Sequence, residues 1–139
     1  MHLIDTDILT HLHAGRPRVV RAMEQLDDPD ACITIVTQIE LLRGRFDFLL
    51  KASTSDELLR AQALLRRTQE LLSQIIIIPF DEAAASHFDR LRKNKKMRKI
   101  GRADLIIASI ALANHATLVT RNLRHFKQVP GLKIVNWLP

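Results

Sequence analysis

The chain opens with Met1–Asp5, which reads Met-His-Leu-Ile-Asp, so that two apolar residues run directly into a carboxylate. Related arrangements occur later: Glu40 follows the apolar run Ile33–Val36, and Asp104 precedes the apolar stretch Leu105–Ala113. In a parallel α/β sheet, the carboxyl ends of the strands meet at one edge, where ligands bind. We therefore expect these three acidic residues to lie close together at that edge.

Short apolar segments alternate with longer segments whose apolar residues have helical spacing. The predicted strands are Leu3–Ile4, Cys32–Val36, Ile75–Ile78, Thr117–Thr120 and Lys133–Asn136. The predicted helices are Thr6–His13, Pro17–Leu26, Thr37–Lys51, Ser55–Ser73, a helix capped by Asp81 and ending near Leu91, and Ala103–Asn114. This alternation predicts a three-layer α/β/α fold with a central, mainly parallel sheet, formed by residues 1–139 as a single domain.

Two local patterns refine this prediction. The continuous apolar run Ile75–Ile78, ended by Pro79, is typical of a central parallel strand. Thr37-x-x-Glu40 is a capping box, which places Glu40 in the first turn of its helix. Asp5, Asp7 and Asp104 also lie where helices are expected to start, so helix capping is the alternative role for each of them.

The composition is that of an ordinary globular protein, with 139 residues, 47% hydrophobic and 26% charged. A net charge of +6 favours an acidic partner, with nucleic acid as the leading candidate. The single cysteine, Cys32, excludes an intrachain disulfide. We see no signal peptide and no apolar run long enough to cross a membrane, so a cytoplasmic protein without membrane contact is expected.

Clustered carboxylates in a basic chain suggest a metal site. Crowded carboxylates do not all stay ionised unless a cation neutralises them, and oxygen ligands suit Mg²⁺ or Mn²⁺. Such an ion lowers the pKa of its bound water and neutralises charge on a reacting phosphate. No Ser-His-Asp arrangement is apparent, and we expect the scattered histidines to be surface or structural residues: His11, His13, His87, His115 and His125.

A run of cations precedes Asp104. Its candidate RNA-binding residues are Lys93, Lys95, Lys96, Arg98, Lys99 and Arg102. Contacts to phosphates would position an RNA strand without reading its bases. The alternative is a solvated surface, which is the usual role of a charge run.

Four motifs carry a resemblance to a known family. They are Ile4–Leu9 (Ile-Asp-Thr-Asp-Ile-Leu), Thr37-x-x-Glu40-Leu41-x-x-Gly44, Ile100–Ala108 (Ile-Gly-Arg-Ala-Asp-Leu-Ile-Ile-Ala) and Leu118–Phe126 (Leu-Val-Thr-Arg-Asn-Leu-Arg-His-Phe). In this order and spacing the chain resembles the PIN domain, most closely its VapC toxin branch. The resemblance implies that Asp5, Glu40 and Asp104 bind one or two divalent ions that activate water for RNA cleavage.

The resemblance also assigns neighbouring positions. Asn122 stands at a fourth catalytic position where the family often has Asp, which puts a second metal ion in doubt. Asp7 stands where the family often has Asn, and its charge is a candidate replacement for the missing one. Thr6 and Thr120 are candidates to hydrogen-bond the metal-binding carboxylates.

The resemblance further implies an antitoxin that holds the toxin inactive, and a homodimer. The leucine-rich helices from Glu40 to Leu72 offer apolar surface for either contact, unless those leucines only complete the core. Three other functions stay open at this point. They are a haloacid dehalogenase-like phosphoryl-transfer enzyme suggested by Asp5-Thr6-Asp7, a phosphate-receiver domain, and a catalytically silent domain that binds RNA or a partner.

Overall fold

The computed structural model describes residues 1–29 and 31–138. Its centre is a five-stranded sheet in the order β3-β2-β1-β4-β5, and every neighbouring pair of strands is parallel. The strands are β1 (His2–Ile4), β2 (Ala31–Thr34), β3 (Ile76–Ile78), β4 (Thr117–Val119) and β5 (Lys133–Val135). The predicted parallel sheet is therefore confirmed, and all the strands end at the same edge.

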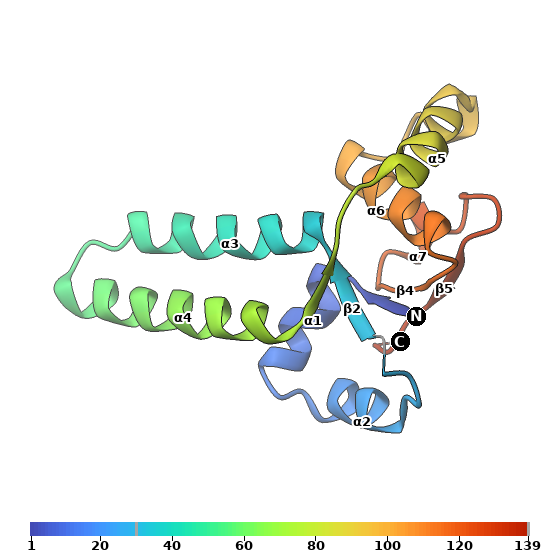
Figure 1. The fold of residues 1–139 in the computed structure, drawn as a ribbon. Helices are drawn as coiled ribbons and strands as arrows, with labels where there is room; N and C mark the ends of the chain where they lie inside the picture. Colours follow the sequence, from blue (N-terminus) through green and yellow to red (C-terminus); the bar gives the residue numbers. More distant parts are fainter. Residues whose placement is uncertain (30, 139) are drawn as a thin grey trace.

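Helices cover both faces of this sheet (Figure 1). They are α1 (Thr6–His13), α2 (Pro17–Gln25), α3 (Ile35–Leu50), α4 (Ser55–Gln74), α5 (Glu82–Lys93), α6 (Arg102–Ala113) and α7 (Leu123–Phe126), with a short 3₁₀ helix η1 (Lys95–Met97) before α6. Leu3 and Leu118 pack with α5, α6 and α7 on one face, whereas Ile4 and Val119 pack with α1 to α4 on the other. Because side chains alternate across a strand, these short strands supply both cores of the three-layer fold.

The first strand is the centre of the sheet. β1 pairs with β2 on one side and β4 on the other, so Leu3 and Ile4 are almost fully buried. β3 lies at an edge, and its Ile76 is 52% exposed. The prediction of a central strand at Ile75–Ile78 was therefore wrong. A continuous apolar run shows that both faces of a strand tend to be covered, but it does not show whether a second neighbour pairs with its backbone.

The boundary between β2 and α3 also differs from the prediction. The strand ends at Thr34 and the helix begins at Ile35, because the Thr34 hydroxyl accepts a hydrogen bond from the backbone N–H of Thr37 across 3.3 Å. The predicted capping box at Thr37 was wrong, and Glu40 lies in the second turn of α3, not in the first. The β-branched residues Ile35 and Val36 are helical here because packing outweighs their strand preference.

Helices α3 and α4 form a long antiparallel pair that extends away from the sheet (Figure 1). Arg45 of α3 donates a hydrogen bond from Nε to the Thr68 hydroxyl of α4, 3.0 Å away. Several large apolar residues of this pair remain exposed: Ile39, Phe46, Phe48, Leu50, Leu58 and Leu59. An exposed apolar surface of this kind marks an interaction site. None of the helices in the described residues is both long and apolar enough to cross a membrane.

Candidate active site

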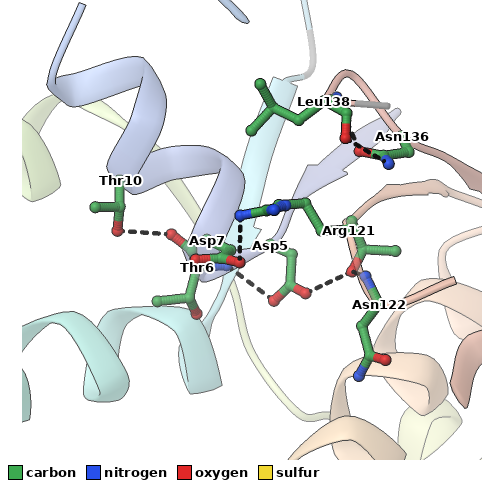
Figure 2. A network of polar contacts seen from close by, with 9 residues as sticks. Asp5, Thr6, Asp7, Thr10, Arg121, Asn122, Asn136 and Leu138 are labelled. Carbon is green, nitrogen blue, oxygen red and sulfur yellow. Dashed lines mark hydrogen bonds and ion pairs between the residues drawn. The ribbon is translucent and has the colours of Figure 1, made fainter. Parts of the chain in front are cut away.

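Asp5 lies at the carboxyl end of β1, where it is also the N-cap of α1. Its carboxylate accepts hydrogen bonds from the backbone N–H of Thr6 and from the hydroxyl of Thr120, both 2.8 Å away. Its own N–H donates to the carbonyl of Val119 across 2.9 Å. Figure 2 shows this carboxylate between the start of α1 and the segment that carries Arg121 and Asn122. The Asp5 side chain thus caps α1 and also contacts Thr120 at the carboxyl edge of the sheet.

Asp104 lies in the first turn of α6 and meets the segment after β4. Asn122 donates from Nδ2 to Oδ2 of Asp104 across 3.1 Å, and the same amide nitrogen is 3.0 Å from Nδ1 of His125. Nδ1 of His125 is also 3.3 Å from Oδ2 of Asp104. The backbone N–H of Asn122 donates to the Thr120 hydroxyl, 3.0 Å away. Thr120 therefore links Asp5 to Asn122, which in turn contacts Asp104.

Glu40 approaches the same edge from α3. Its Oε1 accepts a hydrogen bond from the Thr6 hydroxyl across 3.0 Å, and that hydroxyl is 3.3 Å from the Thr37 hydroxyl. Thr6 and Thr120, the two threonines proposed from the sequence as carboxylate partners, thus each donate a hydroxyl hydrogen bond to one of the acids. The strand order explains this arrangement, because Asp5, Glu40 and the Thr120 segment follow the adjacent strands β1, β2 and β4.

The acidic residues influence one another's protonation. Burial raises the pKa of Asp5, hydrogen bonds from Thr120 and Thr6 oppose this rise, and the charges of Asp104 and Asp7 add to it. Burial also raises the pKa of Glu40, the Thr6 hydrogen bond opposes the rise, and the charges of Asp5 and Asp104 add to it. A site with raised carboxyl pKa values and mutual repulsion gains from a bound cation.

The oxygen atoms at this site can be compared with the ligands that a divalent metal ion needs. Within residues 1–29 and 31–138, no three His, Cys, Asp or Glu side chains are grouped closely enough to hold one ion between them in the present conformation. The available donors are carboxylate and amide oxygens, which are the ligands that Mg²⁺ and Mn²⁺ prefer. Asp5, Glu40 and Asp104 are also close enough for their charges to repel. The chemistry of the site therefore fits such an ion, which would draw these side chains together.

Asp7 forms an ion pair that the sequence did not indicate. Its carboxylate is 3.6 Å from the Arg121 guanidinium, and both side chains are more than half exposed (Figure 2). Its charge adds to the rise in the pKa of Asp5, so it lies within electrostatic range of the site. The Arg121 charge nevertheless offsets part of the negative charge that Asp7 would add.

The cationic run contributes to a groove next to Asp104. This basic groove has a volume of about 730 Å³ and is lined by Lys95, Lys96, Arg98, Lys99, Arg124, His125 and Gln128. Four of the six candidate RNA-binding residues therefore line the basic groove: Lys95, Lys96, Arg98 and Lys99. Arg102 lines a neighbouring hollow of about 270 Å³ with Phe88 and Met97, and Arg98 lines both features. Lys93, at the end of α5, lines neither the basic groove nor this hollow.

Sequence reasoning did not single out several residues at the site. The prediction of a surface or structural role for His125 did not foresee its contacts with Asp104 and Asn122. A signal was present, because Asn122 is the N-cap of α7 and a residue three positions later lies beside it on the helix. The same short helix also positions Arg124, and the residues that flank it, Arg121 and Gln128. The sequence alone did not show where this helix lies relative to the site.

Comparisons with known proteins identify the family of this chain. The family model described as "PIN domain" matches residues 2–132. The tRNA(fMet)-specific endonuclease VapC of Shigella flexneri is 30% identical over 97% of this chain and 96% of its own length. The solved structure of VapBC2 from Rickettsia felis bound to a promoter DNA fragment has a TM-score of 0.78 at 28% identity, covering 98% of each chain. VapBC from Salmonella typhimurium, also solved bound to DNA, has a TM-score of 0.77 at 26% identity, covering 98% of this chain and 97% of its own. The chain therefore belongs to the PIN domain family, in its VapC branch.

Proposed function

We propose that this chain is the ribonuclease toxin of a VapBC-type toxin–antitoxin pair and hydrolyses phosphodiester bonds in RNA. The observation that carries the proposal is the convergence of Asp5, Glu40 and Asp104 at the carboxyl edge of the sheet, next to a groove lined by cations. Relatives that match nearly the whole chain carry the names tRNA(fMet)-specific endonuclease VapC and Ribonuclease VapC1. Membership in this family sets the haloacid dehalogenase and phosphate-receiver alternatives aside.

The proposed cofactor is Mg²⁺ or Mn²⁺, held by Asp5, Asp104 and Glu40. When bound, such an ion supplies positive charge that favours the ionised form of water and offsets the charge on the reacting phosphate. Asn122 donates its amide N–H to Asp104, so it holds this carboxylate in place without adding a negative charge. With Asn122 in place of a fourth carboxylate, the site has fewer negative charges, which favours one bound ion over two.

The remaining residues of the site hold these carboxylates in place. Thr120 donates to Asp5 while it accepts from the N–H of Asn122, so one buried hydroxyl fixes two sides of the site. Thr6 fixes Glu40 through its hydroxyl and Asp5 through its backbone N–H. Preorganised groups of this kind avoid a reorganisation cost when the substrate binds.

The proposed partners are an antitoxin of the VapB type and a second copy of the chain. Solved relatives include complexes described as VapBC from Rickettsia felis and from Salmonella typhimurium. The exposed apolar residues of α3 and α4 offer a surface for these contacts. A basic side chain of the antitoxin that reached the carboxylates would neutralise them in place of a metal ion and would block the site. Activity against cellular RNA would place the free toxin in the cytoplasm and make it inhibit growth.

The test is a cleavage assay with purified protein. Mixed cellular RNA, with tRNA as the first substrate to examine, is incubated with Mn²⁺, with Mg²⁺ and with a chelator. We expect cleavage with either ion, none with the chelator, and products with a 5′-phosphate and a 3′-hydroxyl. Mapping of 5′ ends after induction in cells would identify the target. A folded protein that binds RNA but never cleaves it would support the catalytically silent alternative.

A further inference from the structure

We infer that the basic groove binds the backbone of a single-stranded RNA segment on one side of the cleaved bond. This inference rests on the proposed ribonuclease function and deepens it by naming the path of the substrate. Two segments build the groove: η1 and the residues after it supply Lys95, Lys96, Arg98 and Lys99, and α7 with its following turn supplies Arg124 and Gln128. The second segment was not expected from the cationic run alone.

The charges in the groove are not neutralised by the protein. Among the described residues, none of the ion pairs involves a lysine or arginine of the groove, and no acidic residue lines it. Cations brought together from two segments repel one another unless an anion lies between them. A polyanion that spans both segments would relieve this repulsion along the whole groove.

His125 joins the groove to the acidic site. It lines the groove, and its Nδ1 is 3.3 Å from Oδ2 of Asp104 and 3.0 Å from Nδ2 of Asn122. When the Asn122 amide donates to both Asp104 and His125, the imidazole proton is on Nε2 and is available to a ligand. A backbone that occupies the groove would therefore come within reach of Asp104 at His125.

The lining favours a single strand held by its phosphates. A double-stranded RNA module contacts a helix along about 16 base pairs, which is far longer than a groove built from seven residues. Cationic grooves that follow a flexible backbone are the usual way of binding single strands. The residues that line this groove include no Phe or Trp on which bases could stack. The contacts would therefore position the strand, and its sequence would be read elsewhere.

The test compares groove residues with matched neighbours. Lys96→Gln and Arg124→Gln each remove a groove cation, whereas Lys93→Gln and Lys127→Gln remove an equal charge from α5 and from the end of α7, outside the groove lining. All four substitutions are combined with Asp104→Asn, which is expected to prevent cleavage of the RNA during the measurement. Binding of a short single-stranded RNA is then measured by fluorescence anisotropy over a range of salt concentrations. For single strands, each lost phosphate contact lowers the magnitude of the log–log salt slope by about 0.7. We expect that decrease for each groove variant, about twice as much for the double groove variant, and none for the controls.

A slope that changes equally in groove and control variants would overturn the inference. A second measurement tests the side of the strand: uncharged methylphosphonate linkages are placed singly around the bond that the wild-type protein cleaves. We expect weaker binding from substitutions on one side only, with the effect at one linkage lost in Arg124→Gln. Equal effects on both sides would contradict this placement. Tighter binding of poly-glutamate than of RNA, weakened by the same groove variants, would show that the groove serves an acidic peptide.

The two proposals fail separately. If the wild-type protein cleaves RNA but the groove variants keep the wild-type salt slope, the ribonuclease function stands and the groove inference is wrong. If the salt slopes change as expected but no RNA is cleaved with Mg²⁺ or Mn²⁺, the groove binds RNA and the ribonuclease proposal is wrong.

Discussion

The side-chain amide of Asn122 donates to the carboxylate of Asp104 across 3.1 Å, and the same nitrogen faces Nδ1 of His125. An amide at this position neutralises no charge, but it satisfies one oxygen of Asp104 without a metal ion. A carboxylate at the same position would repel Asp104 until a cation lies between them. We therefore expect the residue at position 122 to set a balance between the stability of the metal-free protein and its affinity for a metal ion.

Asn122→Asp tests this balance. We expect the variant to have a lower Tm than the wild type in the presence of a chelator, because Asp104 loses a donor and gains a like charge. We also expect tighter Mn²⁺ binding in titration calorimetry, because one more anion faces the ion. Asn122→Ala is the control that removes the donor without adding charge. Unchanged Mn²⁺ affinity in Asn122→Asp would place this residue outside the metal site.

Asp104→Asn tests the role of the carboxylate in α6. The substitution keeps the shape of the side chain and its place in the first helical turn while removing the charge that a cation needs. We expect loss of RNA cleavage, with the free energy of unfolding changed by no more than about 1 kcal/mol, the scale of a cap effect. Chemical denaturation and a cleavage assay measure the two quantities. A variant that cleaves at the wild-type rate would remove Asp104 from the catalytic set.

Thr120→Val removes the buried hydroxyl between Asp5 and Asn122 while keeping the shape of the side chain. The Asp5 carboxylate loses its donor and the Asn122 N–H loses its acceptor. We expect the free energy of unfolding to fall by about 1–3 kcal/mol, the cost of unsatisfied buried polar groups. Thr120→Ser keeps the hydroxyl and is expected to recover most of this loss. Equal stability of the valine and serine variants would mean that the hydroxyl is dispensable.

The raised pKa values of Asp5 and Glu40 predict how pH acts on the protein. Without metal, the folded state holds protons on these groups more tightly than the unfolded chain does. Their contribution to stability is therefore lost as the pH rises from about 4 through the raised values. Metal binding requires the ionised carboxylates, so the increase in Tm caused by Mn²⁺ should be large at neutral pH and small near pH 4.

The control for this pH dependence is a variant without the two titrating groups. Asp5→Asn combined with Glu40→Gln should remove most of the Mn²⁺ effect at neutral pH, as followed by differential scanning fluorimetry. An Mn²⁺ effect of the same size at both pH values in the wild type would show that these carboxyls do not bind the ion.

Much of the fold followed from local patterns. The bounds of α1 agree with the prediction residue for residue, and the N-cap of α5 at Asp81 was expected. The errors arose where two local signals competed. At Ile35 and Val36 the strand preference of β-branched residues competed with a helix capped one turn earlier by Thr34. Only the packing of α3 against the sheet decides between them.

The acidic residues of the site could be predicted from the sequence, but the contacts of their neighbours could not. Acidic residues after strands can be recognised from the sequence because strand ends meet at one edge. The contacts of His125 depend on where the four-residue helix α7 places its side chains, and the pairing of Asp7 depends on the direction of Arg121. These are tertiary properties of short segments, which local patterns do not determine.

The hydrogen bond from Thr120 to Asp5 joins residues that are 115 positions apart. Strand β1, which Asp5 follows directly, also pairs with β4, so it lacks one of its two neighbours until this late segment has been made. A polypeptide interrupted before Thr117 lacks both β4 and the Thr120 hydroxyl, which hold β1 and Asp5 in place. We therefore expect the cleavage site to be completed only late in synthesis, and truncated products to lack nuclease activity.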